Sequence, residues 1–281
     1  MKILKLGIVK IIAFVLLLFF LVILLLQLGV LLSSSYEAWR PDYPKEDISE
    51  ILKKDELSDE DYACLLRQTG LTKLGIDGLR ERGLNEKILK IQEKYFEEQN
   101  YFFYSFAPFT GYLKRDMQDM STEFCYLENG DILYSKTTYV SFFEIGHSSM
   151  VIDGERGVMA QASGYKSKLK LLSIATFSVR PTFVVLRVKG LDEDARESVA
   201  SYVKSELLGA EYSAFAGIFG DKAKETLSKT QCAHFIWYSY MKYGVDLDSN
   251  GGKLVLPKDI VKSENVSIVQ IFGIDPEKIL H

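Results

Sequence analysis

The feature that most constrains this chain is an uncharged apolar run near its N-terminus, Ile11–Leu32, broken only by Gln27 and Gly29. At about 1.5 Å per residue, a helix of this length spans the roughly 30 Å hydrocarbon layer of a bilayer. A secretory signal peptide has a shorter apolar stretch, about 7–15 residues. The run therefore predicts a transmembrane signal anchor over residues 1–35, although Ser33–Ser35 also offers a cleavage region.

The charges beside this run predict its orientation. Lys2, Lys5 and Lys10 precede it or lie at its edge, whereas Glu37 and Asp42 follow it. The positive-inside rule then places the N-terminus in the cytoplasm and the body outside. We expect a single-pass protein of the cell membrane with an extracytoplasmic body.

The composition of the body argues against nucleic-acid binding. Without the three N-terminal lysines, the 34 basic residues fall to 31, against 38 acidic ones. Phosphate binding needs concentrated Lys and Arg, and no basic arm is present. The apolar and charged fractions, 47% and 26%, are those of a folded protein. We therefore expect no nucleic-acid partner.

The cysteines and histidines are few. Three cysteines, Cys64, Cys125 and Cys232, do not form a disulfide framework, although a Cys64–Cys125 bridge stays open. The three histidines include His147 and His234, and neither CxxC nor HExxH spacing occurs. The sequence predicts no metal and no cofactor.

Hydrophobic periodicity divides the body into two parts. Residues 36–115 are predicted as a helical membrane-proximal region, with a capping box at Ser58–Asp61 and a helix over Asn85–Asn100. The aromatic stretch Tyr101–Phe109 is either core or the lining of a groove for an apolar ligand. Residues 116–281 are predicted as the second domain.

The second domain alternates strand and helix patterns. Its predicted strands are Ile132–Ser135, His147–Ile152, Val158–Ser163, Thr182–Lys189 and Ser267–Phe272. Its predicted helices are Glu193–Leu208 and Cys232–Tyr243. The pattern indicates an α+β fold, a mostly antiparallel sheet with packed helices.

Cys232 is the candidate nucleophile. Ser228 or Thr230 is expected to cap the helix, which places the thiol in its first turn. Unpaired N–H groups and the helix dipole stabilise a thiolate there, and the same N–H groups favour an oxyanion during acyl transfer. A buried small residue is the alternative interpretation.

His147 is the candidate base, because it opens a strand and an imidazole activates a thiol when the fold brings them together. The strands around His147 and Gln161 are expected to form a hairpin. If the residue numbers of each pair across this hairpin sum to 308 or 310, Gln161 or Ser163 lies opposite His147 and orients its ring. His234 is the rival base, but it follows Cys232 by two positions on one helix and faces away. The same geometry argues against a zinc site made from Cys232 and both histidines.

Three blocks of sequence resemble a known family. They are Gly130-Asp-Ile-Leu133; Gly146-His-Ser-Ser-Met-Val151, followed by Gly157-Val-Met-Ala-Gln-Ala162; and Gln231-Cys-Ala-His-Phe-Ile-Trp-Tyr238, followed by Gly244-Val-Asp-Leu247. This order resembles the circularly permuted NlpC/P60 hydrolases, the YiiX/YebB-like branch, in which the His precedes the Cys. The resemblance covers roughly residues 125–273.

The resemblance implies a papain-like fold and a cysteine hydrolase mechanism. The family's nucleophile and base match Cys232 and His147, and its third polar position matches Gln161. Such a peptidase or amidase acts on an amide bond, and the outward topology favours cell-wall peptides over lipid-linked amides. Two alternatives stay open: a lipid-directed acyltransferase or amidase resembling lecithin–retinol acyltransferase, and a non-catalytic binding module.

Overall fold

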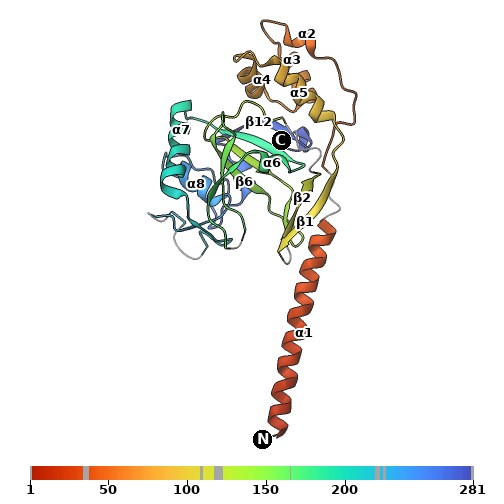
Figure 1. The fold of residues 1–281 in the computed structure, drawn as a ribbon, viewed down its shortest axis with the longest axis vertical. Helices are drawn as coiled ribbons and strands as arrows, with labels where there is room; N and C mark the ends of the chain where they lie inside the picture. The colour runs from red at the N-terminus through yellow and green to blue at the C-terminus, as the bar shows by residue number, and fades with distance from the viewer. Residues whose placement is uncertain are drawn as a thin grey trace.

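The structure, a computed structural model, describes residues 2–33, 38–107, 110–116, 123–164, 166–218, 222–223 and 226–279. The apolar run forms helix α1 (Lys2–Ser33), which projects away from the body beside strands β1 and β2 (Figure 1). Its segment Gly7–Gly29 is long and apolar enough to cross a membrane. The cleavage region Ser33–Ser35 lies largely outside the described residues.

Four short helices follow, as predicted, but they lie on the side of the body away from α1 and not next to it (Figure 1). They are α2 (Ser49–Leu52), α3 (Asp59–Thr69), α4 (Lys73–Arg80) and α5 (Asn85–Phe96). The predicted capping box is confirmed, because the Ser58 hydroxyl accepts from the Asp61 N–H and the Asp61 carboxylate accepts from the Ser58 N–H. Gly70 ends α3 with a φ of +70°.

The aromatic stretch after α5 is a strand, not a continuation of the helical region. Strand β1 (Tyr101–Ala107) pairs with β2 (Thr110–Arg115), and Phe109 lies outside the described residues. Together with β4 (Thr138–Val140) and β5 (Phe143–Glu144), they form a four-stranded sheet in the order β1-β2-β4-β5. We call it the small sheet.

The main sheet has six antiparallel strands in the order β12-β9-β3-β6-β7-β8. The strands are β3 (Ile132–Ser135), β6 (His147–Asp153), β7 (Val158–Gln161), β8 (Lys170–Ser173), β9 (Phe183–Val188) and β12 (Val266–Phe272). The five predicted strands therefore exist, with ends shifted by at most two residues. The expected α+β class is borne out.

The remaining elements surround this sheet. They are α6 (Ala175–Ser178), α7 (Glu193–Tyr202), a π-helical turn (Val203–Leu207), β10 (Glu211–Tyr212), β11 (Lys229–Thr230), α8 (His234–Met241), α9 (Pro257–Val261) and a 3₁₀ turn (Pro276–Lys278). Strands β10 and β11 form a separate parallel pair.

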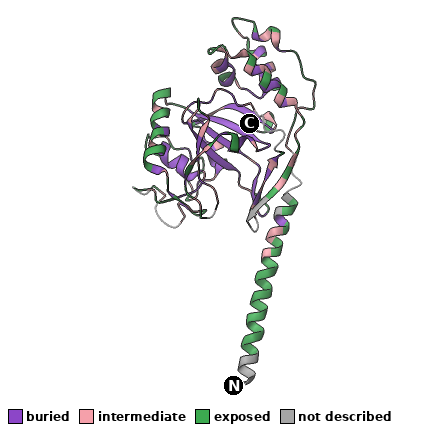
Figure 2. Cartoon of the chain, viewed as in Figure 1, coloured by how far each residue is buried: buried purple, intermediate pink, exposed green. Residues whose placement is uncertain are grey.

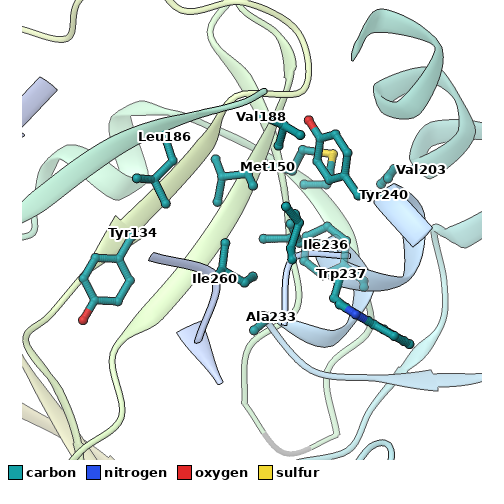
Figure 3. Packing of buried hydrophobic residues seen from close by; sticks show 14 of the residues in the cluster. Tyr134, Met150, Leu186, Val188, Val203, Ala233, Ile236, Trp237, Tyr240 and Ile260 are labelled. Atoms are coloured by element: carbon teal, nitrogen blue, oxygen red, sulfur yellow. The ribbon is translucent and has the colours of Figure 1, made fainter. Parts of the chain in front are cut away.

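Alternating side chains give the main sheet two buried faces (Figure 2). Ile132 and Met150 pack with residues of α7, α8 and α9, such as Ile236 (Figure 3). Leu133 and Val151 pack on the opposite face with residues of α3, α4 and α5. The sheet therefore lies between two helical layers, and helices α3, α4 and α5 share its core.

A buried charge network fixes the start of β3. The Arg187 guanidinium donates to both carboxylate oxygens of Asp131, at 2.9 and 2.8 Å, and to Glu128 at 2.7 Å. Arg196 of α7 donates to the second Glu128 oxygen. The network ties β3, β9 and α7 together, which gives the Gly130-Asp131 pair a structural role.

Candidate active site

Cys232 lies in the turn that leads into α8, at the edge of the main core (Figure 3 labels its neighbour Ala233). The expected cap by Ser228 or Thr230 is wrong: α8 begins at His234, after Ala233, without a side-chain cap. The Gln231 side chain takes this role instead, since its amide oxygen accepts from the Ala233 N–H at 2.8 Å and from the Cys232 thiol at 3.3 Å. The thiol thus lies two residues before the helix and not in its first turn as predicted.

The surroundings of the thiol act in opposite directions on its pKa. Burial raises the pKa of Cys232, whereas hydrogen bonding from the backbone N–H and hydroxyl of Ser148 lowers it. Among the described residues, no other partner lies within normal hydrogen-bond distance of the buried Ser148 hydroxyl. The positive charge of Arg180 also lowers the thiol pKa. Burial has the largest effect, so the resting thiol is protonated at neutral pH.

His147 opens β6 and is buried, with 5% of its surface exposed. Its ring stacks on Phe177 at a centroid distance of 6.3 Å, and its Nε2 atom has no hydrogen-bond partner. Burial, together with the charge of Arg180, lowers the pKa of His147 to about 3, although hydrogen bonding to Gln161 acts in the opposite direction. The imidazole is therefore neutral at physiological pH, which is the form that accepts a proton.

Gln161 lies at the end of β7, and the strand register decides its neighbours. Met150 pairs with Ala160 and Val151 with Met159, so partner numbers sum to 310, one of the two predicted registers. Gln161 consequently contacts Ser149, whose hydroxyl donates to the amide oxygen at 3.1 Å. The Gln161 amide donates to the Ser163 hydroxyl at 2.9 Å.

His234 is engaged elsewhere, as its expected direction on the helix implied. Its Nε2 lies 2.9 Å from the Lys222 carbonyl oxygen and its Nδ1 lies 3.3 Å from the Thr230 hydroxyl. The ring also stacks on Trp237. Both nitrogens therefore hold the loop before α8, and neither is directed to the thiol.

The thiol and the imidazole lie at the same end of β6 but on opposite faces of the sheet. His147 and Ser148 are successive strand residues, so Ser148 faces α8 while His147 faces Phe177. Within the described part of the chain, the Cys232 thiol donates to Gln231, and no hydrogen bond joins it to His147. The structure brings Gln161 into hydrogen-bond contact with His147, but it does not bring the His147 Nε2 atom into contact with the Cys232 thiol.

Sequence inspection missed Arg180, which lies 8% exposed beside these residues. Its guanidinium donates to the Thr138 hydroxyl at 2.8 Å and lies over the rings of Tyr112 and Phe177, at 5.0 and 5.4 Å. Among the described residues, no carboxylate lies within ion-pair distance of it. Burial lowers the pKa of Arg180 to about 10, with Tyr112 and Cys232 opposing this change.

Tyr212 was missed as well. Burial, together with the nearby Cys232, raises the pKa of this phenol to about 12. Neither Arg180 nor Tyr212 belongs to a local motif, because each reaches the thiol from a distant segment of the chain. A buried arginine without an acidic neighbour in sequence is a weak signal by itself.

A hollow of about 1440 Å³ opens near the site, lined in part by Tyr134, Lys136 and Glu144. Tyr134, which lines the hollow, pairs across β3 and β6 with Ser148, and Ser148 is the residue next to the Cys232 thiol. Neither Cys232 nor His147 lines it. In the described residues, no group of three or more His, Cys, Asp or Glu side chains is placed to hold a metal, and all three cysteines are free thiols.

Comparison with known proteins gives a single solved structure to report. No protein-family model matches the chain, and no curated protein matches it. The crystal structure of the metalloprotein YiiX from Escherichia coli O157:H7 aligns with 52% of this chain and 98% of its own, at 15% identity and a TM-score of 0.39. This neighbour carries the name used for the family that the sequence blocks resemble.

Proposed function

We propose that this protein is a membrane-anchored, extracytoplasmic cysteine hydrolase of the permuted NlpC/P60, papain-like type. The observation that carries the proposal is a cysteine next to a helix start, at the same end of β6 as a buried, neutral imidazole with a free Nε2 atom. Its substrate would be an amide, with cell-wall peptides as the first class to test.

The mechanism is acyl transfer through a thioester. Contact of His147 Nε2 with the thiol requires the start of β6 to rearrange, and this rearrangement is assigned to substrate binding. The imidazole then takes the thiol proton while the sulfur attacks the carbonyl carbon. When the tetrahedral species collapses, the C–N bond breaks and the imidazolium protonates the leaving amine. Water, deprotonated by the same imidazole, releases the acid and restores the thiol.

Nearby groups support the charged states of this cycle. Gln161, fixed by Ser149 and Ser163, would orient the imidazole, and Arg180 would stabilise the thiolate and the imidazole's neutral form. The backbone N–H groups of Ser148 and Ala233 lie beside the thiol and would be the donors for a developing oxyanion.

A lipid-directed acyltransferase or amidase is the second candidate. The observation that favours it is the small sheet, whose exposed aromatic residues lie between α1 and the site. This enzyme would use the same Cys232 thioester and pass the acyl group to an acceptor other than water.

The test uses the full chain in lipid nanodiscs, with cell-wall peptides and lipid-linked amides supplied separately. New amine ends should appear with one class, and Cys232→Ala should lose turnover by several orders of magnitude with an unchanged circular dichroism spectrum. Cys64→Ala, a partly exposed thiol on α3, is the matched control and should retain activity. A folded Cys232→Ala protein that keeps turning over would exclude the mechanism, and inactivity of the wild type on both classes would favour a binding module.

A further inference from the structure

The small sheet carries exposed aromatic side chains beside the membrane helix. Phe142, in the turn between β4 and β5, is 58% exposed, and Phe143, the first residue of β5, is 73% exposed. Phe102 and Tyr104, on alternating positions of β1, are each almost half exposed. Clustered apolar groups of this kind on a protein surface mark a contact with another phase or partner.

The end of α1 touches this turn. A side chain at Gly29 would meet the Ser141 hydroxyl and the Phe142 ring at 2.5 to 2.7 Å, so the helix backbone lies directly against them. Contacts of α1 with β2 and β4 continue the same interface. Figure 1 shows the small sheet standing over the end of α1 that is nearest the body.

The length of α1 fixes the depth of that contact. The apolar segment Gly7–Gly29 has 23 residues, or about 35 Å of helix, against roughly 30 Å of hydrocarbon. Gly29 therefore lies at the boundary between hydrocarbon and head groups. Phe142, which packs against Gly29, lies at that level too, and aromatic side chains are favoured there.

We propose that the small sheet is a second membrane contact, which inserts the Phe142–Phe143 turn and the outer face of β1 into the interfacial layer of the bilayer that α1 spans. The occupant of this surface is phospholipid. The neighbouring charge does not oppose insertion, because Glu144 is partly buried and 3.9 Å from the Lys136 ammonium. Apolar burial in the interface supplies the attraction.

The contact has a consequence for the site. Three residues separate Phe143 from His147, and the backbone N–H groups of Ile145 and Gly146 both donate to the Thr138 carbonyl oxygen. Thr138 and Tyr112, both in the small sheet, also hold Arg180. Insertion of the turn would hold this end of β6 close to the lipid surface, within reach of lipid-borne groups. The membrane contact itself does not rest on the proposed chemistry.

The first test places a tryptophan in the turn of the full chain in phosphatidylcholine nanodiscs. The tryptophan added in Phe143→Trp should be quenched by brominated phosphatidylcholine. The tryptophan added in Leu74→Trp on α4, a position that is also partly exposed, should not be quenched. The parent chain, which contains Trp39 and Trp237, gives the background quenching. Equal quenching in the two variants would overturn the proposal.

The second test separates lipid from protein as the occupant. Benzoylphenylalanine at position 143 should crosslink to a labelled phosphatidylcholine on irradiation, and the same residue at position 74 should not. A crosslink to a second copy of the chain, or to another membrane protein in native membranes without any lipid adduct, would refute lipid as the occupant. Circular dichroism of each variant confirms that the fold is kept.

Discussion

The Ser149 hydroxyl donates a 3.1 Å hydrogen bond to the amide oxygen of Gln161. Hydrogen bonding to Gln161 also raises the pKa of His147, so Gln161 interacts with two neighbours on the same face of the sheet. The amide group also donates to Ser163 at 2.9 Å. Gln161 is therefore held in one orientation by two serines, which suits a positioning residue.

We predict that Gln161→Ala loses activity by about tenfold, less than His147→Ala, because it removes orientation and not the base. Gln161→Glu should keep both serine contacts, since each hydroxyl can donate to a carboxylate. Its negative charge should raise the pKa of His147. The measurement is the pH dependence of Cys232 alkylation in the three proteins. An unchanged profile in both variants would remove Gln161 from the mechanism and leave Ser163→Ala as the next variant to test.

The depressed pKa of His147 predicts acid sensitivity. The imidazole titrates near 6.5 when unfolded and at about 3 when folded. Below pH 6.5 the unfolded chain binds a proton that the folded one does not, so stability is present above pH 6.5 and is lost as pH falls. At pH 5 the loss is about 2 kcal/mol.

The thermal midpoint of the nanodisc-bound chain between pH 7 and 5 measures this effect. His147→Gln should make the thermal midpoint depend less on pH. Adding His234→Gln should reduce this dependence further, because burial lowers the pKa of His234 as well. Parallel curves for wild type and His147→Gln would show that the imidazole is not buried in its neutral form.

The buried network at Asp131 predicts a large stability effect away from the site. Asp131→Ala leaves the Arg187 cation without its bidentate partner, and breaking a buried pair in this way costs about 3–5 kcal/mol. Asp153→Ala, whose partner Arg156 is 83% exposed, should cost about 1 kcal/mol or less. Unfolding midpoints of the two variants test the contrast, and similar midpoints would contradict it.

Much of the main sheet could be predicted from the sequence, because each of its strands has a local apolar pattern with turn residues at its ends. Thus β6 and β7 were identified with nearly their observed ends. The small sheet could not be predicted, since Phe143–Glu144 is two residues long and depends on pairing with β4. The strand character of Tyr101–Ala107 was hidden by its continuity with a helical region.

The candidate site was predictable to the extent that its residues are adjacent in sequence to clear elements. His147, Gln161 and Cys232 each lie at the end of a strand or next to a helix start. What the sequence could not reveal is which face each residue occupies relative to the others. Whether Ser148 or His147 faces the thiol depends on the packing of α8, a long-range property. Arg180 was missed for the same reason.

Arg180 gives the last prediction. Its guanidinium lies between two aromatic rings without an ion-pair partner among the described residues, and its charge lowers the pKa of the Cys232 thiol. Removal of an uncompensated buried cation relieves a desolvation cost. Arg180→Met should therefore leave the thermal midpoint unchanged or raised, while the thiol pKa rises and alkylation at pH 7 slows.

Arg180→Lys tests charge against shape. It keeps the charge, so the thiol pKa should stay closer to that of the wild type, although the planar contacts with Tyr112 and Phe177 are lost. Arg156→Met, at an exposed position, is the control for loss of one positive charge. Alkylation rates from pH 6 to 10 give the thiol pKa for each protein. If Arg180→Met lowers the thermal midpoint and leaves the alkylation profile where it was, the guanidinium is a packing group, and thiolate stabilisation at this site must come from Ser148.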